Sequence, residues 1–337
     1  MRRGSALFAL LVLAAAAPAQ APREERITPP YRDAPEMHAA PGVAKGTLNS
    51  FIMTSAESRI YPGIRQLDND VTRRRDAYGN RIAAPFDQES EPGAYRRDVF
   101  VYIPAGYQRG REVPFIVVQD GRDYAARMAA ALDSLIAQKR VPMMVAVMIQ
   151  SGGGDAQGSE RGLEYDTMSG RYAEFVETEV LPRAAKLYGI KFTSNPNGRA
   201  TMGGSSGAAA ALSMAWYHPE WYHKVLSYSG TFVNQAAPVD AATPRGAWDY
   251  HARLIPENPR KPIRIWMEVG EKDLHWQDPE STFHNWPMAN DRMAAALKAK
   301  GYDYRYVFAQ DAVHVDGNVV AQTLPQALEW LWRDFPR

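Results

Sequence analysis

One serine stands in a pattern that suits nucleophilic catalysis. Residues 203–207 read Gly-Gly-Ser-Ser-Gly and match G-x-S-x-G, and four alanines follow at 208–211. In this pattern the serine occupies a sharp turn between a strand and a helix, where small neighbours make room for the crossing backbone. We therefore expect Ser205 to be a nucleophile. Ser206 occupies the x position, so its hydroxyl should turn into the helix N-terminus while its backbone N–H serves as an oxyanion donor.

A serine hydroxyl is a weak acid and needs a general base nearby. Of the seven histidines, His314 alone lies between the last expected strand and the last expected helix. Serine hydrolases with this elbow carry their residues in the chain order Ser, acid, His. Asp273 follows the penultimate expected strand and is the first choice for the acid that orients the imidazole. Glu271 and Asp278 remain alternatives.

An Asp-Gly turn offers a second oxyanion donor. Asp120, Gly121 and Arg122 directly follow an apolar run that ends at Gln119. Glycine permits close approach of the backbone to a ligand. We expect an amide of Gly121 or Arg122 to complete the oxyanion hole, and an ordinary surface turn is the alternative.

The segments around these residues alternate between strand-like and helix-like patterns. The expected strands are Asp98–Ile103, Pro114–Gln119, Pro142–Ile149, Arg199–Met202, Val225–Tyr228, Ile263–Val269 and Tyr304–Phe308. The expected helices are Tyr124–Lys139, Arg171–Leu187, a segment that starts at Ser206, Met288–Lys300 and Leu324–Phe335. Apolar strands separated by helices indicate a mostly parallel central sheet in a three-layer α/β fold. Ligand sites in such sheets lie beyond the carboxyl ends of the strands, where all three candidate residues fall.

Composition narrows the function classes. Lys and Arg number 39 against 38 Asp and Glu, so the net charge of +1 indicates neither a nucleic-acid partner nor an anionic membrane surface. The chain has no cysteine, which excludes disulfides, thiolate metal sites and a cysteine nucleophile. It also lacks H-E-x-x-H, so we expect neither a metal site nor a cofactor. Composition says nothing of the oligomeric state.

The N-terminus has the pattern of an export signal. Arg2 and Arg3 precede an apolar run from Ala6 to Ala17, and an A-x-A pattern ends at Ala19. We interpret residues 1–19 as a signal peptide, 20–45 as a flexible N-terminus and 46–337 as one domain. A periplasmic or secreted protein is expected, without a membrane anchor after cleavage. The polar stretch 68–91 is expected to be a surface insertion.

Several further segments resemble the enterochelin esterase-like family, which also includes feruloyl and acetylxylan esterases. They are Ser58–Gly63 (the family's early strand), Val99–Pro104, Val118–Gly121, Arg161–Asp166, Gly203–Gly207, Gly270–Leu274, Asn285–Pro287 and Leu328–Trp332. The resemblance extends from Thr47 to Arg337 and implies the α/β-hydrolase fold. It also implies hydrolysis of small carboxylic esters through an acyl-enzyme, without a cofactor. The insertion at 68–91 departs from the family pattern, and so does the context Val313-His314-Val315 in place of a glycine-flanked histidine.

Other polar and aromatic residues are candidates for substrate binding. We expect Arg161 and Glu164 to pair near the site, next to Tyr165 and Asp120. Trp276 and Trp286 could form an aromatic wall for a sugar or aryl group, and His275 and His284 could line the pocket. Two other functions stay open: a sugar lactonase that uses the same residues, and a periplasmic binding protein of this fold without catalysis.

Overall fold

Strands that are buried on both faces form the centre of the protein. The computed structural model describes residues 24–38, 40–155 and 157–336, so the expected signal segment at 1–19 lies outside the described residues. Within these ranges one sheet has nine strands. In spatial order they are β2 (Thr47–Thr54), β5 (Arg96–Ile103), β8 (Val145–Ile149), β7 (Phe115–Gln119), β10 (Arg199–Gly204), β11 (Lys224–Tyr228), β12 (Arg264–Gly270), β13 (Asp303–Ala309) and β1 (Glu24–Ile27). Within this described nine-stranded sheet, only the β2–β5 and β5–β8 pairs are antiparallel.

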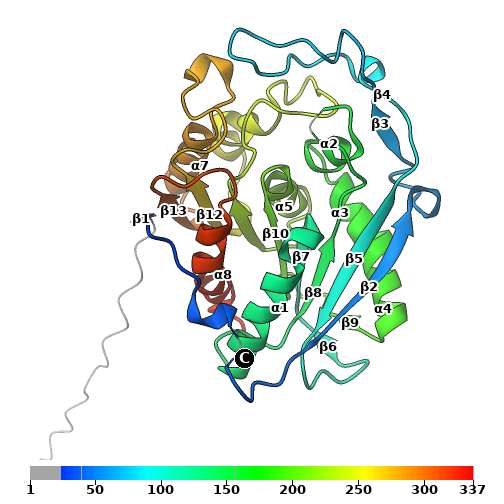
Figure 1. Ribbon diagram of the computed structural model, residues 1–337, viewed down its shortest axis with the longest axis vertical. Helices are drawn as coiled ribbons and strands as arrows, with labels where there is room; N and C mark the ends of the chain where they lie inside the picture. The colour runs from blue at the N-terminus through cyan, green and yellow to red at the C-terminus, as the bar shows by residue number, and fades with distance from the viewer. Residues whose placement is uncertain (1–23, 39, 156, 337) are drawn as a thin grey trace, which may run out of the picture.

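Helices cover both faces of this sheet (Figure 1). The α-helices are α1 (Gly121–Ala137), α2 (Glu160–Tyr165), α3 (Arg171–Phe175), α4 (Leu181–Tyr188), α5 (Ser206–Tyr217), α6 (Ile255–Glu257), α7 (Trp286–Ala299) and α8 (Gly317–Trp332). Side chains of α1 and α8 pack in one core with one face of the sheet. Side chains of α3, α4, α5 and α7 pack in a second core on the other face. The expected three-layer α/β arrangement is therefore confirmed.

The sequence patterns explain why these elements form. Strands such as β7 and β8 are apolar and wholly buried, as is typical of parallel strands between two helical layers. In α1 the buried residues Tyr124, Met128 and Leu135 recur at helical spacing and face the sheet. The expected helix Arg171–Leu187 is α3 and α4 joined by a π-helical turn at Val176–Val180.

Two short pairs of strands and a few helical turns lie outside the main sheet. The strands are β3 (Ile64–Gln66), paired with β4 (Ser90–Pro92), and β6 (Glu112–Val113), paired with β9 (Lys191–Phe192). The turns are the 3₁₀ segments Pro35–Met37, Ser55–Glu57, Phe86–Gln88, Pro196–Gly198, Gly246–Trp248 and Glu280–Thr282 and the π segment Tyr250–Leu254. None of the described helices is long and apolar enough to cross a membrane.

The beginning of the described chain differs from its prediction. Residues 20–45 are expected to be flexible, but Glu24–Ile27 form an edge strand that pairs in parallel with β13. Lys298 Nζ lies 3.1 Å from Glu24 Oε1, and Arg305 pairs with Glu25. Without β1, the outer edge of β13 would leave its backbone donors and acceptors unpaired. β1 pairs with this edge. A charged, proline-rich composition does not reveal such partners, because they lie about 280 residues away.

The position predicted for the early strand is also wrong. Ser58–Gly63, which resembles a strand of the family, has no regular structure, and the strand is β2 at Thr47–Thr54. Gly63 adopts a φ of +105°, and Pro62 precedes it. Neither residue suits the middle of a strand, which explains the position of β2 before this turn.

A fully buried ion pair joins the sheet to α2. The side chains of Arg97, on β5, and Glu164 are in contact and are both 0% exposed. The Arg97 guanidinium also lies 4.3 Å from the ring centroid of Tyr95. The predicted pairing of Glu164 with Arg161 is therefore wrong. Helical spacing places these two residues on α2, but the neighbouring strands decide which residue each one meets.

Removal of one partner of this pair should be costly. We expect Arg97→Met to lower the free energy of unfolding by about 3–5 kcal/mol, because it leaves the Glu164 carboxyl buried without its partner. Urea-induced unfolding followed by circular dichroism measures the change. The control is Arg183→Gln, which breaks an exposed pair with Glu57 at 2.8 Å and should cost less than about 1 kcal/mol. Equal losses in the two variants would contradict the assignment.

Candidate active site

Ser205 occupies a sharp bend between β10 and α5. Its backbone has φ 57° and ψ −131°, a region that a non-glycine residue rarely adopts. The bend is held on both sides, since the Ser205 N–H donates to the Tyr228 carbonyl at 3.0 Å and the Thr231 N–H donates to the Ser205 carbonyl at 3.2 Å. A Cβ atom on Gly203 would lie 2.3 Å from the Gly207 backbone. These glycines are thus required by the close approach of strand and helix.

His314 is oriented by a buried carboxylate. Its Nδ1 lies 2.5 Å from Asp273 Oδ1, and the Asp273 side chain is 0% exposed. The same Asp273 oxygen accepts a hydrogen bond of 2.6 Å from the Leu274 N–H. Asp273 follows β12 and His314 follows β13, so two neighbouring parallel strands bring the residues together. The imidazole is thereby held through Nδ1, which leaves Nε2 to act as a base.

The loop that carries His314 is itself anchored. Val315 has a φ of +45°, although a β-branched residue disfavours this region. Its N–H donates to Ser229 Oγ at 2.9 Å, which ties the loop to the segment after β11. A hydrogen bond thus holds the turn that a flanking glycine provides in the family pattern.

The two alternative acids have other partners. Glu271 Oε2 accepts a hydrogen bond of 2.9 Å from the Asp311 N–H. Asp278 Oδ2 lies 3.2 Å from His275 Nδ1 and accepts a hydrogen bond of 3.0 Å from Asn80. Among the three candidate acids, Asp273 is the one that contacts His314.

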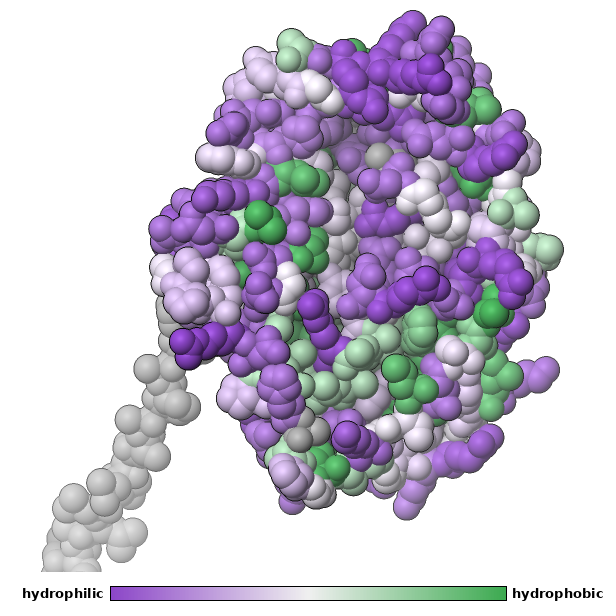
Figure 2. Space-filling model, in the orientation of Figure 1, coloured by the Kyte–Doolittle hydropathy of each residue, from purple (hydrophilic) through white to green (hydrophobic). Residues whose placement is uncertain are grey.

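Ser205 and His314 line one cleft beyond the carboxyl ends of the strands. This nucleophile cleft has a volume of about 420 Å³ and is lined by Asp120, Asp123, Tyr124, Arg127, Asp155, Arg161, Gly204, Ser205, His314 and Val315. Ser205 also lines a neighbouring cleft of about 350 Å³, here called the insertion cleft. Its other residues are Gln66, Arg75, Gly79, Asn80, Arg81, Asp155, Gln157, Ser206, Gln235, Leu274, His275, His284 and Trp286. Figure 2 shows a hollow at this end of the molecule with a largely hydrophilic rim.

The predicted substrate-binding residues are only partly brought together. Asp120 and Arg161 form a two-pronged ion pair, with Arg161 Nη2 2.8 Å from Asp120 Oδ2, and both line the nucleophile cleft. Tyr165 is buried beneath this pair, and its hydroxyl accepts a hydrogen bond from the Asp120 N–H at 3.2 Å. Tyr165 therefore positions Asp120 and does not line either cleft. Glu164 is wholly buried with Arg97, so its predicted contact with substrate is wrong.

The two tryptophans are in different environments. Trp286 lines the insertion cleft, and its ring centroid lies 6.1 Å from that of His314 in an edge-on arrangement. Trp276 is 45% exposed and lines neither of these two clefts. An aromatic wall made by both rings is therefore not formed. His275 and His284, which the sequence suggested as alternatives, do line the insertion cleft.

The expected oxyanion donors are not equally available. Ser206 is the first residue of α5, so its N–H has no partner within the helix. Its hydroxyl accepts a hydrogen bond of 3.2 Å from Gln235 and does not turn into the helix N-terminus as expected. The Arg122 N–H donates to Gln150 Oε1 at 3.2 Å and is occupied. Gly121 starts α1 with its backbone against Met148, where a Cβ atom would lie 2.3 Å from the carbonyl carbon.

Burial shifts the pKa of several groups near the site. Burial, and next the charge of Asp273, raise the pKa of Glu268 well above its usual range. Burial also raises the pKa of Asp166 to about 6, against a hydrogen bond from Gln235. Burial and the neighbouring His275 lower the pKa of His284, which favours its neutral imidazole. Among the described residues, no group of three or more His, Asp or Glu side chains could hold a metal ion.

Comparison with known proteins identifies the family. Residues 93–331 match the family described as "Putative esterase". The chain belongs to this esterase family. Membership confirms the resemblance seen in the sequence, and ester hydrolysis is the activity that the family indicates.

The two individual relatives described next are less than 30% identical to this chain. The chain is 28% identical to the iron(III) enterobactin esterase of Dickeya dadantii over 170 residues, which cover 50% of this chain and 37% of that protein. It is 23% identical to the uncharacterized protein YbbA of Bacillus subtilis over 257 residues, which cover 72% of this chain and 95% of that protein.

Two solved structures show the same fold. The enterobactin esterase FES of Shigella flexneri superposes with a TM-score of 0.52 at 22% identity, over 71% of this chain and 56% of that chain. A ferulic acid esterase gives a TM-score of 0.55 at 17% identity, over 85% of this chain and 100% of that chain. This chain thus spans little more than half of the enterobactin esterase structure. The superpositions establish the α/β-hydrolase fold.

The contact between Asp273 and His314 makes a direct prediction for this esterase. We expect Asp273→Asn to lower kcat for 4-nitrophenyl acetate about 10⁴-fold, because an amide favours the wrong imidazole tautomer. The variant should fold normally, since the change is isosteric. Glu271→Gln is the matched control and should stay within a few-fold of the wild-type rate. A similar loss in both variants would show that Asp273 has no special role.

Proposed function

We propose that this protein is a serine carboxylic-ester hydrolase that works through an acyl-enzyme on Ser205. The observation that carries the proposal is the position of His314, held by Asp273 and lining the same cleft as Ser205. The strained elbow serine, which lines the cleft, and the membership of an esterase family support it. Enterobactin and ferulic acid esterases among the similar proteins agree with a small-molecule ester as substrate.

The first half of the reaction forms the acyl-enzyme. Ser205 Oγ attacks the ester carbonyl while His314 Nε2 takes its proton, and the carbonyl oxygen becomes an oxyanion. The C–O bond to the alcohol then breaks, and His314 returns the proton to the leaving alkoxide. Asp273 holds the imidazole and stabilises its positive charge. In the second half, water attacks the acyl carbon while His314 takes its proton, the bond to Ser205 Oγ breaks, and His314 passes the proton to Ser205, which releases the carboxylic acid.

Two backbone amides are proposed to bind the oxyanion. The N–H of Ser206 follows the nucleophile directly and lies at the N-terminus of α5. Gly121 begins α1 and is separated by one residue from the end of β7, the strand next to β10. Arg122 is set aside because its N–H already binds Gln150. The loss of one such donor typically lowers kcat by about 10²–10³-fold.

Export is a separate proposal that rests on the N-terminal residues. The arginines at positions 2 and 3, the apolar run and the A-x-A pattern support a signal peptide that ends at Ala19. We propose a periplasmic or secreted enzyme on this basis. N-terminal sequencing of protein recovered from periplasm and medium tests it, and a chain that keeps residues 1–19 would contradict it.

Substitution of two neighbouring serines tests the assignment of the nucleophile. We expect Ser205→Ala to abolish turnover of 4-nitrophenyl acetate and the mass shift caused by a fluorophosphonate probe. Ser206→Ala is the matched control: its proposed role uses the backbone N–H, so it should keep activity within about tenfold. A wild-type rate in Ser205→Ala would disprove the mechanism. If the wild-type protein neither reacts with the probe nor hydrolyses any ester, the alternative of a binding protein without catalysis is favoured. Assay of sugar lactones beside esters tests the alternative of a lactonase.

A further inference from the structure

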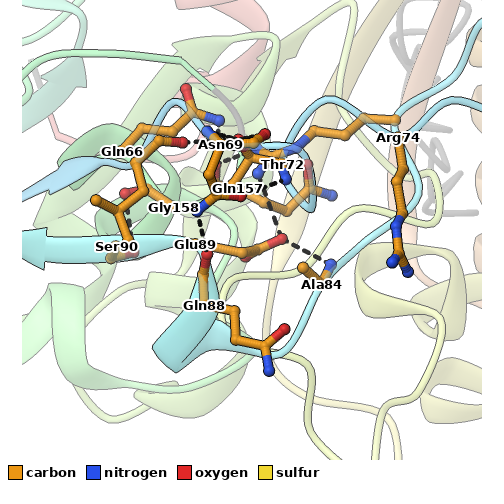
Figure 3. Close-up of polar contacts among 12 residues, drawn as sticks. Gln66, Asn69, Thr72, Arg74, Ala84, Gln88, Glu89, Ser90, Gln157 and Gly158 are labelled. Atoms are coloured by element: carbon orange, nitrogen blue, oxygen red, sulfur yellow. Dashed lines mark hydrogen bonds and ion pairs between the residues drawn. The ribbon is translucent and has the colours of Figure 1, made fainter.

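The insertion at 68–91 is a structured arm. It follows β3 and runs into β4, and these two strands pair antiparallel. Near its base, Thr72 Oγ1 donates to the Leu67 carbonyl at 2.7 Å (Figure 3). At its tip, Asp76 Oδ1 accepts hydrogen bonds from the Tyr78 and Asn80 N–H groups at 2.8 and 2.9 Å. An isolated β-bridge pairs residues 75 and 81, so the arm turns back on itself.

The arm is attached to the body on both sides of the insertion cleft. On one side Gln66 Nε2 donates to the Gln157 carbonyl at 3.0 Å, and Ser90 Oγ donates to the Gly158 carbonyl at 2.9 Å (Figure 3). On the other side Asn80 Nδ2 donates to Asp278 Oδ2 at 3.0 Å. The segment before α2 and the loop after β12 thus share one covering element. This attachment holds the arm over the nucleophile.

Two arginines of the arm line the insertion cleft with Ser205. Arg81 is held from behind: its side chain is 10% exposed, donates to the Gln157 carbonyl and lies 3.4 Å from Glu89. Glu89 is itself fixed by the Ala84 N–H at 2.8 Å (Figure 3). Burial, against the attraction of Glu89, lowers the pKa of Arg81, and the nearby charge of Arg75 lowers it further. Arg75 and Arg81 are therefore close enough to interact, and both line the insertion cleft.

Arg75 has hydrogen-bonding capacity to spare. Its Nη1 donates to the carbonyls of Thr72 and Arg74 at 3.3 and 2.9 Å. Within the described part of the chain, no carboxylate forms a salt bridge with Arg75. A guanidinium binds a carboxylate best through two parallel N–H donors, and Nε and Nη2 of Arg75 remain for such a contact.

Other charged groups of the insertion cleft have charged partners: Arg81 contacts Glu89, and Asp155 shares Arg161 with Asp120. Asp155 pairs with Arg161 at 2.9 Å. His275 pairs with Asp278 at 3.2 Å. Burial lowers the pKa of His284, which favours its neutral form. Among the described lining residues, Arg75 is therefore the cation without an acidic partner.

We propose that the arm forms a carboxylate-binding subsite next to Ser205, with Arg75 as the contacting residue, so that the preferred substrates are esters that carry a carboxylate. The inference rests on the proposed esterase function and adds the chemical class of its substrate. Arg81 is a positioning residue that sets the tip of the arm against residues 157–158. The departure of this chain from its family at 68–91 then has a function in substrate selection.

Two matched pairs of esters test the subsite. The mono-4-nitrophenyl ester of terephthalate, whose para carboxylate cannot reach its own ester, is compared with its methyl ester and places the carboxylate on the acyl side. 4-Acetoxybenzoate, compared with its methyl ester, places it on the alcohol side. The kcat/KM of each ester is divided by its spontaneous hydrolysis rate, which removes differences in intrinsic reactivity. The wild-type protein, Arg75→Gln and the matched control Arg74→Gln are compared.

Arg74 is a suitable control because it is the adjacent exposed arginine of the same arm and does not line the insertion cleft. We expect the wild-type protein to prefer the carboxylate ester in at least one pair by roughly tenfold. Arg75→Gln should lose this preference and Arg74→Gln should keep it. Thermal unfolding of both variants checks that they fold. A wild-type protein without preference in either pair, or equal losses in both variants, would overturn the proposal.

Failure of the subsite and failure of the esterase function give different results. Hydrolysis of the neutral esters without a preference for carboxylates would reject the subsite alone. If no ester is hydrolysed, the esterase proposal fails, and calorimetric binding of 4-hydroxybenzoate and its methyl ester decides about the subsite. Binding of the free acid that Arg75→Gln weakens and Arg74→Gln does not would support it. Equal or absent binding of acid and ester would reject it.

Discussion

The structure depends on a backbone conformation that Ser205 would not adopt by itself. Its positive φ is unfavourable for a residue with a side chain, and the surrounding hydrogen bonds and packing must compensate. Tyr228 and Thr231 hold the two sides of the bend, and Gly203 and Gly207 allow β10 and α5 to approach. The result is a hydroxyl at the end of the central strand, beside the first amide of a helix. That position lets the hydroxyl line the cleft close to a backbone N–H at the helix N-terminus.

The parallel sheet does the rest of the positioning. The register pairs Gly204 with Tyr228, Tyr228 with Glu268 and Gly270 with Ala309, so the strands end close together at one edge. The loops after β12 and β13 then bring Asp273 and His314 into contact. Hydrogen bonds such as the one from Val315 to Ser229 hold these loops in place. A rigid sheet with short anchored loops is a general means of fixing catalytic geometry.

Buried polar contacts give the rim of the site its shape. Arg97 and Glu164 fix α2 to the sheet, and from α2 Arg161 reaches the Asp120 carboxylate at the end of β7. The same segment before α2 receives the arm at 157–158. The short helix α2 and the segment directly before it therefore contact the core through Glu164, the nucleophile cleft through Arg161 and the arm through residues 157–158. A change in its packing is expected to alter substrate binding as well as stability.

The sequence by itself determined the α/β class, the elbow with Ser205 and the places of His314 and Asp273 after their strands. These features follow from local patterns: apolar strands, small residues at a bend and polar residues where strands end. Only the tertiary structure showed that Asp273, rather than Glu271 or Asp278, contacts His314. It also paired Glu164 with Arg97, placed β1 beside β13 and set the arm across the cleft. Each of these depends on which residues distant in sequence become neighbours, because an ion pair or a sheet edge takes the partner that packing brings within reach. Spacing along one helix or one strand carries no record of that partner.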